Sequence, residues 1–443
     1  MLLTAKRHKI QRAETVTRYR WFVLAFIFVI YTLSYGDRAN IGVVLPVIKA
    51  EFQLSNFEAG SLASFFFVGY ALTQIPAGFW YSLFGVKKLM ALSMIMVSVF
   101  TGLIGTSGSA FMIKMYRLGL GLAEGPTPVG MAATINTWFP PKEKGIASGI
   151  YLAAAKFAPV IVPPICVAIM QSYGWRYVFY WFALPGIILA AGWYFLIKDR
   201  PEESPFCSPG EVDYIKNTAV ANQQKEIQQK KSFLWLDKLI HLKHVSKIET
   251  NAQIFCSWNI WGNTFGYCLM LSVVNGILTW IPSYLVNEKH FSFIKMGFVA
   301  SAPWIGAVLG NLIGGWIADK IFDKRRKPLM LVSTLSTAIM MLLLINSPAD
   351  ARLLGIMLFF TGFLLNLGFS AFTAYPMGLT TKKTFPIAIA VVNSGGHLGS
   401  VFSPMFAGFL LDKFNYGAVF SFFALCAALS LLVILTVDEP IQE

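Results

Sequence analysis

Arg117 and Glu124 lie inside one long apolar run of the sequence, residues 111–139, which is long enough to cross a bilayer. Arg117 carries a permanent positive charge, and Glu124 follows it seven residues later. Seven residues of α-helix turn through about 700°, so the two side chains point in nearly the same direction. Charges at membrane depth are costly and usually face a cavity or a partner. The spacing therefore allows two interpretations: an Arg–Glu pair that only holds helices together, or a site that binds an anion at Arg117 and moves a proton through Glu124.

The first apolar run of the chain carries another pair of charges, because Asp37 and Arg38 are adjacent within it. Tyr35 precedes Arg38 by three residues and lies near it on a helix surface. In one interpretation, Asp37 neutralises Arg38 or pairs with another helix for structure alone. In the other, the two charges serve a functional site, since they are expensive at this depth without a purpose.

A third cation, Lys156, interrupts the apolar stretch Tyr151–Pro159. It is either a further cationic contact for a ligand or a structural partner for Asp37 or Glu124. Two arginines and one lysine thus stand against two carboxylates inside the apolar segments. This balance favours an anionic substrate over a cation or a cationic drug.

The composition shows what must hold these charges. The chain has 443 residues, of which 56% are hydrophobic and only 13% charged, and its mean hydropathy is +0.60. Soluble domains carry about 25% charged residues. The sequence therefore predicts an all-α membrane protein. Twelve transmembrane helices are predicted near residues 21–49, 59–83, 88–106, 110–138, 145–171, 175–198, 254–286, 294–320, 328–346, 353–380, 385–411 and 415–437.

The positive charge of the chain is placed asymmetrically. The net charge is +14, and most of the 36 Lys and Arg residues fall in the N-terminal segment and in loops on its side of the membrane. This asymmetry predicts that both termini are cytoplasmic. The expected location is a bacterial inner membrane. The positive charge then determines the topology and interacts with anionic lipid. It does not indicate a nucleic-acid partner.

The order of the segments predicts two halves of six helices each, a common plan for transporters. The stretch Gly78–Lys88, after the second segment, recurs weakly as Gly315–Lys327 after the eighth. We expect an N-terminal bundle at residues 1–198, a cytoplasmic linker at 199–253 and a C-terminal bundle at 254–443. The linker is expected to be partly helical at the membrane surface.

No pattern of residues indicates catalysis or a bound metal. The five cysteines are scattered and show no metal-binding spacing, so neither a metal, a cofactor nor a disulfide is expected. The chain is therefore predicted not to be an enzyme. Its expected partners are a small organic anion, protons and the lipid bilayer, and it is expected to be a monomer.

Uncharged polar residues of other segments are candidates for the same cavity. Tyr70 and Gln74 lie four residues apart on one face of the second segment, where either a ligand or a neighbouring helix would satisfy them. Tyr284 is among the polar and aromatic residues of the seventh segment. Asn393 and His397 share a face of the eleventh, although a lone histidine is more often a satisfied core residue than a proton carrier.

The loop after the eighth segment, with Gly315 and Asp319, resembles the signature loop of the major facilitator superfamily. The pair Asp37–Arg38 resembles its anion:cation symporter branch, which includes bacterial galactonate, glucarate and hexuronate importers and animal sialin and vesicular glutamate transporters. The resemblance covers essentially the whole chain. The other motifs that carry it are Arg117-x-x-x-Gly-x-x-Glu-Gly, Trp138-Phe-Pro-Pro-Lys-Glu-Lys-Gly145, Gly174-Trp-Arg-Tyr-Val-Phe-Tyr180 and Thr279-Trp-Ile-Pro-Ser-Tyr-Leu285.

The resemblance implies twelve helices in two pseudo-symmetric bundles, alternating access, and proton-coupled uptake of an organic anion. It implies that Arg38 and Arg117 hold the substrate carboxylate and that Asp37 and Glu124 are protonated, with His397 as a further proton-coupling candidate. The remaining candidates for substrate contact are Tyr35, Tyr70, Gln74, Lys156, Tyr284 and Asn393.

The sequence departs from the family pattern in the first signature loop, which has Ser82-Leu83 where the family usually has Asp-Arg. A charged latch on the cytoplasmic side of the first half is then missing, whereas the second half keeps its counterpart. The candidate residues for this cytoplasmic gate are Gly78, Gly85, Asp319 and Arg325.

The predicted function is import of a sugar acid or another carboxylate, including a polycarboxylate, coupled to protons. The alternatives are a transporter of carboxylate siderophores, or a proton antiporter or exporter of the same fold. The sequence does not identify the anion.

Overall fold

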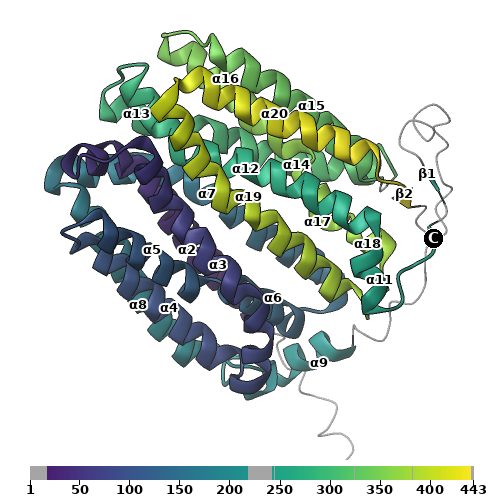
Figure 1. Ribbon diagram of the computed structural model, residues 1–443. Coiled ribbons are helices and arrows are strands. Elements are labelled where there is room, and N and C mark those ends of the chain that lie inside the picture. The colour runs from purple at the N-terminus through teal and green to yellow at the C-terminus, as the bar shows by residue number, and fades with distance from the viewer. Residues whose placement is uncertain (1–16, 218–241, 244, 324, 382, 441–443) are drawn as a thin grey trace, which may run out of the picture.

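The computed structural model describes residues 17–217 and 242–440 except 244, 324 and 382, and the described chain is almost entirely helical (Figure 1). The elements, in chain order, are α2 (Tyr19–Glu51), α3 (Asn56–Phe84), α4 (Val86–Gly105), α5 (Ala110–Glu124), α6 (Thr127–Trp138), α7 (Pro141–Tyr173), α8 (Trp175–Leu196), η1 (Pro201–Glu203), α9 (Pro209–Asn217), β1 (Leu242–Lys243), α11 (Asn251–Cys256), α12 (Trp258–Asn287), α13 (Phe293–Val299), α14 (Ala302–Lys320), α15 (Lys327–Ile345), α16 (Ala351–Leu367), α17 (Phe369–Ala374), α18 (Pro376–Leu379), α19 (Phe385–Lys413), α20 (Tyr416–Leu435) and β2 (Glu439–Pro440).

Each of the twelve predicted membrane segments is helical in the structure, so the predicted fold class is confirmed. Within the described residues, ten spans are long and apolar enough to cross a bilayer, and α3 makes an eleventh although it bends by 55° at Pro76. The remaining segment, predicted as one helix at 110–138, folds as α5 and α6. It breaks at Gly125 and Pro126 because proline has no N–H to donate and its ring disrupts the preceding turn.

The same packing scheme occurs twice along the chain. In the first half, α2 packs on α7, α3 on α5 and α4 on α8. In the second half, the corresponding pairs are α12 with α19, α14 with α16 and α15 with α20. In Figure 1 the purple and blue helices of the first half lie beside the green and yellow helices of the second. We therefore propose the division into bundles at 1–198 and 254–443, because each half repeats one arrangement of six helices.

The two halves meet most closely at the ends of the helices that lie away from both chain termini, here called the remote side. There α3 packs along α19, and α7 contacts α13 and α14. The carboxylate of Asp412 on α19 accepts the backbone N–H groups of Asn56 and Phe57, at 2.7 and 2.8 Å. These are the first N–H groups of α3, which a helix cannot satisfy by itself. An anion from one half thus caps a helix of the other.

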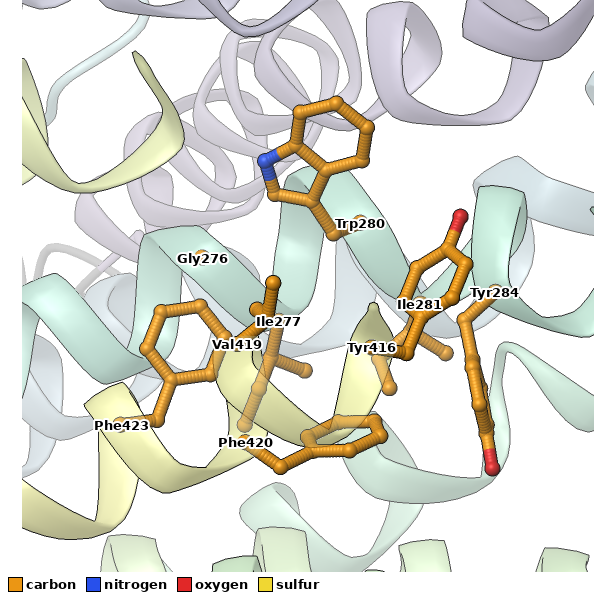
Figure 2. A pocket seen from close by; sticks show the side chains of 9 residues that line it. All are labelled: Gly276, Ile277, Trp280, Ile281, Tyr284, Tyr416, Val419, Phe420 and Phe423. Atoms are coloured by element: carbon orange, nitrogen blue, oxygen red, sulfur yellow. The ribbon is translucent and has the colours of Figure 1, made fainter. Parts of the chain in front are cut away.

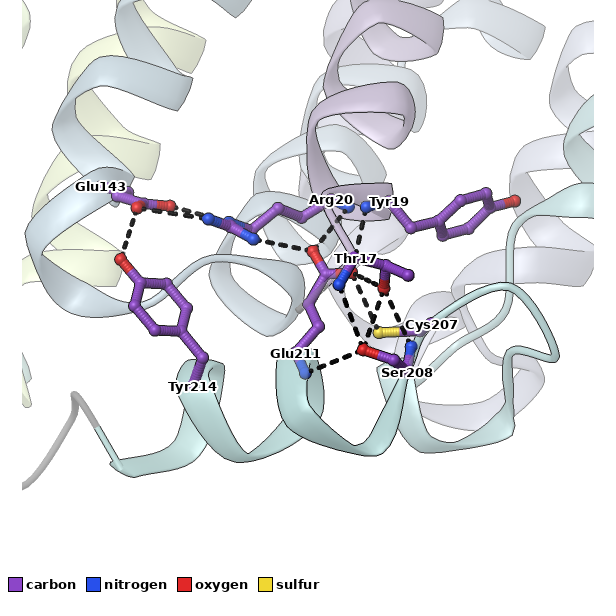
Figure 3. A network of polar contacts seen from close by, with 8 residues as sticks. All are labelled: Thr17, Tyr19, Arg20, Glu143, Cys207, Ser208, Glu211 and Tyr214. Carbon is purple, nitrogen blue, oxygen red and sulfur yellow. Dashed lines mark hydrogen bonds and ion pairs between the residues drawn. The ribbon is translucent and has the colours of Figure 1, made fainter. Parts of the chain in front are cut away.

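The linker is fixed to both halves. On the side of the second half, β1 pairs in parallel with β2, and Ile248 bridges to Thr380. On the side of the first half, α9 lies against the starts of α2 and α7 (Figure 3). The described linker therefore contains helix, as predicted, while its residues 218–241 and 244 lie outside the described residues.

Glu211 of α9 is fully buried and holds this end of the linker in place. It accepts hydrogen bonds from the hydroxyl of Thr17 at 2.6 Å and from Nη1 of Arg20 at 2.8 Å (Figure 3). Arg20 also donates from Nε to Glu143 at 2.9 Å. Burial alone would raise the pKa of Glu211, but the hydrogen bonds from Thr17 and Arg20 hold that pKa below its ordinary value. The carboxylate is therefore charged at neutral pH.

We predict that Glu211→Ala releases α9, because it leaves Arg20 with one of its two anions and removes the acceptor of five donors, the Cys207 thiol included. A spin label at the exposed Asp213 reports this as a gain in mobility. In the wild type, the stabilisation by Glu211 is fully present above the pKa of a glutamate in the unfolded chain, about 4.3. It is lost as the pH falls through the lower pKa that Glu211 has in the folded protein.

The control is Glu202→Ala, which removes a linker ion pair with Lys216 whose side chains are 39% and 60% exposed. Surface pairs contribute little, so the label should stay immobile. Equal mobility in the wild type and in Glu211→Ala would contradict the assignment.

Candidate functional site

The centre of the first half contains a buried ion pair between α2 and the end of α5. Arg38 donates from Nε and Nη2 to Oε1 of Glu124, at 2.8 and 2.6 Å. Their side chains are 2% and 0% exposed. The second carboxylate oxygen of Glu124, Oε2, is buried and has no hydrogen-bond partner among the described residues. Glu124 thus has one oxygen committed to Arg38 and one unused.

Arg117 does not pair with Glu124, although both lie on α5. Its Nη1 donates to the backbone carbonyl of Asp37 at 2.8 Å, and its Nε to that of Leu62 at 3.2 Å. Arg117 therefore ties α5 to both α2 and α3. The fold therefore does not form the Arg117–Glu124 pair that the helical spacing allowed, because Glu124 has a closer partner on α2.

Asp37 and Arg38 are adjacent in sequence but bind different groups. Successive helical residues point about 100° apart, so the two side chains diverge. The carboxylate of Asp37 is buried and accepts from Nδ2 of Asn40 at 3.3 Å, while the guanidinium of Arg38 is directed at Glu124. Asp37 therefore does not neutralise Arg38 by direct contact.

Aromatic rings surround the guanidinium of Arg38. Its central carbon lies 4.3 Å from the ring centre of Tyr35, 4.4 Å from that of Tyr70 and 5.3 Å from that of Phe66. Such cation–π contacts stabilise a cation away from water. Phe66 was not among the predicted site residues, yet its position four residues before Tyr70, on the same helix face, could have indicated it.

His397 brings the second half to this cluster. Its ring lies 4.9 Å from that of Tyr70, edge to face, and 6.4 Å from that of Phe67. Its Nδ1 is buried and has no hydrogen-bond partner within the described chain. A Cβ at Gly399 would clash with the carbonyl of Cys268, so the glycine face of α19 lies directly on α12. The opposite face, with His397 and one turn away Asn393, is left for the first half.

Lys156 also faces the second half. Its Nζ lies 4.4 Å from the ring centre of Phe369 on α17. It forms no ion pair with a carboxylate in the described part of the chain, so the predicted pairing with Asp37 or Glu124 is not adopted in this conformation.

Two other candidates lie differently. The hydroxyl of Tyr284 shares a hydrogen bond with Ser347, and its ring packs on those of Tyr416 and Phe420. It belongs to the packing of α12 against α20 and not to the arginine cluster. Gln74 lies one turn beyond Tyr70, at the bend of α3, and its Oε1 is buried with no partner among the described residues.

The gate candidates lie on the side of the chain termini. Asp319 pairs with Arg326, Nη1 to Oδ1 at 3.1 Å, while Nη1 of Arg325 donates to the carbonyl of Phe322 at 3.3 Å. Gly85 has a φ of 77°, a left-handed turn between α3 and α4 that suits glycine, and Gly78 is exposed on α3. Ser82, in place of the usual acid, donates to the carbonyl of Phe79 within its own helix, at 2.7 Å.

Two cavities lie away from the arginine cluster. One is an apolar gap between α12 and α20 with no room for a water molecule, lined by rings such as those of Trp280 and Phe423 (Figure 2). The other, of about 240 Å³, lies between the linker and Leu379. No group of three or more potential metal ligands occurs among the residues that the structure describes.

Comparison with known proteins decides the family. The profile of the Major Facilitator Superfamily matches residues 27–347 and 295–443. The chain belongs to this superfamily. The solved structure of a bacterial homologue of the human lysosomal transporter Spinster, in an inward-facing and occupied conformation, superposes with a TM-score of 0.71 at 18% identity, covering 95% of this chain and 94% of that one. The chain is therefore a membrane transporter and not an enzyme.

Several relatives carry names of sugar-acid transporters. The "Probable galactarate/D-glucarate transporter GarP" of Escherichia coli (strain K12) is 28% identical over 430 residues, 94% of this chain and 93% of that protein. The "Probable galactarate/D-glucarate transporter GudP" of Bacillus subtilis (strain 168) is 27% identical, over 91% of this chain and 89% of that one. The "Probable L-galactonate transporter" of Escherichia coli (strain K12) is 25% identical, over 98% and 93%.

The missing latch predicts a shifted balance between conformations. We expect Ser82→Asp with Leu83→Arg to favour closure of the terminal side, because one charge-assisted contact is worth about 1.5–3 kcal/mol. Spin labels at the exposed Phe84 and Met377, one in each half, should then move closer together in a variant without native cysteines.

The control is the reversed pair Ser82→Arg with Leu83→Asp, which adds the same charges in the wrong order. If the distance distribution of the first variant matches that of the control, the latch has no part in the balance.

Proposed function

We propose that this transporter imports a sugar acid together with protons, with Glu124 and the substrate carboxylate competing for Arg38. The observation that carries the proposal is the buried pair Arg38–Glu124 with its unused oxygen Oε2. A carboxylate with one oxygen unpartnered in an apolar interior carries a desolvation cost. A proton on that oxygen would lower this cost and release Arg38 for another anion.

The cycle follows from this competition. In the outward-open state, protons from outside neutralise Glu124, and Asp37 as a second site, so that Arg38 and Arg117 attract the substrate anion. A cavity whose charges are balanced costs less to close in the membrane, so the halves can rock. Substrate and protons leave on the inside, and Glu124 then pairs with Arg38 again. The conformation described here, with the remote side closed and this pair formed, fits the substrate-free return.

The names of the relatives support the class of substrate. Galactarate and glucarate are sugar acids with a carboxylate at each end, and galactonate has one. A sugar acid offers carboxylates for guanidinium groups, which bind them with a planar fork. It also offers hydroxyls for the polar groups His397, Asn393 and Gln74. We place the protein in a bacterial inner membrane with both termini in the cytoplasm, as its charge asymmetry predicts.

The direct test is uptake of labelled galactarate, glucarate and galactonate into proteoliposomes with an imposed pH gradient. Accumulation of at least one acid that disappears with a protonophore is the expected result. Transport that does not depend on the pH gradient would refute proton coupling. Absence of transport of galactarate, glucarate and galactonate would refute the substrate class.

Arg117→Lys should abolish most transport. The lysine keeps the charge but cannot donate to the carbonyls of Asp37 and Leu62 and still offer a planar fork to a carboxylate. Initial uptake rates should fall by at least about tenfold at equal amounts of protein in the membrane.

Lys114→Arg, the reverse exchange on the same helix, is the control and should transport normally. Unchanged uptake by Arg117→Lys would show that the charge alone is enough and that Arg117 does not recognise the anion by its geometry.

Glu124→Gln should separate binding from proton coupling, because glutamine resembles the protonated acid and cannot release a proton. The variant should still bind substrate and exchange it across the membrane, yet fail to concentrate it against a gradient. Counterflow and gradient-driven uptake in the same proteoliposomes measure the two activities.

Glu51→Gln serves as the control, since Glu51 lies at the far end of α2 and pairs with Arg176 where both side chains are 38% exposed. Concentrative uptake by Glu124→Gln would assign coupling to another residue, with Asp37 the next to examine.

A further inference from the structure

Lys156 forms no ion pair with a carboxylate among the described residues. Its side chain is partly buried in the middle of α7. Its Nζ lies over the face of the Phe369 ring, 4.4 Å from the ring centre. A cation–π contact offsets only part of the cost of holding an ammonium in the membrane interior. The two buried carboxylates of the first-half cluster are already engaged, Glu124 by Arg38 and Asp37 by Asn40.

Lys156 lies at nearly the same membrane depth as Arg38. The helices α2 and α7 pack together and run in the same direction, since Arg20 at the start of α2 pairs with Glu143 at the start of α7. Further along, the rings of Tyr31 and Tyr151 lie 4.4 Å apart and set the register of the two helices.

The register fixes the two cations relative to each other. Arg38 follows Tyr31 by seven residues, a rise of about 10 Å, and Lys156 follows Tyr151 by five residues, a rise of about 8 Å. The two charges are therefore level along the helix axes. They differ in direction, because Arg38 faces Glu124 on α5, whereas Lys156 faces Phe369 in the second half.

We infer that Lys156 binds a second acid group of the substrate, so that the transporter selects sugar acids with a carboxylate at each end. This inference rests on the proposed function, in which Arg38 and Arg117 hold the first carboxylate. A substrate with one carboxylate would leave Lys156 unpaired when the cavity closes, which is costly in a low-dielectric interior. A dicarboxylate would satisfy it. Lys156 is thus a residue that determines specificity and not part of proton coupling.

The two acids to compare are galactarate and galactonate, which differ in having a carboxylate or a hydroxymethyl group at one end. Binding to the purified full-length protein is measured by calorimetry, which does not depend on coupling. The wild type should bind galactarate more tightly. Lys156→Gln keeps a polar side chain without the charge, and it should lose at least about tenfold in affinity for galactarate while its affinity for galactonate changes little. Lys156→Arg should retain the preference.

The outcomes separate this inference from the proposed function. If the wild type binds both acids and Lys156→Gln keeps the wild-type ratio of affinities, the inference is wrong and the proposed function stands. If the wild type binds neither acid and does not bind glucarate, both are wrong. Should Lys156→Gln fail to fold, a wild type that binds galactonate as tightly as galactarate overturns the inference by itself, and Lys156→Arg with its preference intact supports it.

Discussion

The buried ion pair between Arg38 and Glu124 is the interaction on which the rest of the site depends. A charge of either sign alone in this position would be costly, and removing one partner leaves the other uncompensated. The chain brings the two together by ending α5 at Glu124, where Gly125 and Pro126 interrupt the helix, and by close packing of α3 on α5. The rings of Tyr35 and Tyr70 then cover the guanidinium of Arg38. The pair uses only one oxygen of Glu124, which in the proposed cycle is the reason that a proton or a competing anion can break it.

The charges are distributed unequally between the halves. The ion pair, Arg117, Asp37 and Lys156 all belong to the first half, whereas the described helices of the second half carry their charges near their ends. The second half approaches the cluster with neutral groups, the ring of Phe369 and the imidazole of His397. One half therefore holds the buried charges of the cluster, and the other contacts it through neutral surfaces.

Two contacts between the halves connect the charged cluster to the movement of one half relative to the other. On the remote side, Asp412 caps the start of α3, an interaction that opening must break. At mid-depth, His397 rests on Tyr70, which itself covers Arg38. The ring of Tyr70 thus lies between Arg38 and α19. On the terminal side the described linker is bound to each half separately, by Glu211 to α2 and by β1 to β2, so it follows both halves without joining their cores.

The sequence by itself determined the class, the twelve segments and the identity of the charged residues, because long apolar runs have one stable form in a bilayer and charges within them are rare. It also placed Tyr35 near Arg38 on one helix surface, since helical spacing is local, but it could not bring Tyr70 of another helix to them. It could not decide which partner each charge takes. Arg117 and Glu124 share a helix face, yet Glu124 binds Arg38, 86 residues earlier, and Arg117 binds backbone carbonyls of two other helices. It also could not show that Tyr284 lies away from the site or that Phe369 contacts Lys156. These choices depend on how helices pack across the bundle, and only the tertiary structure sets those distances.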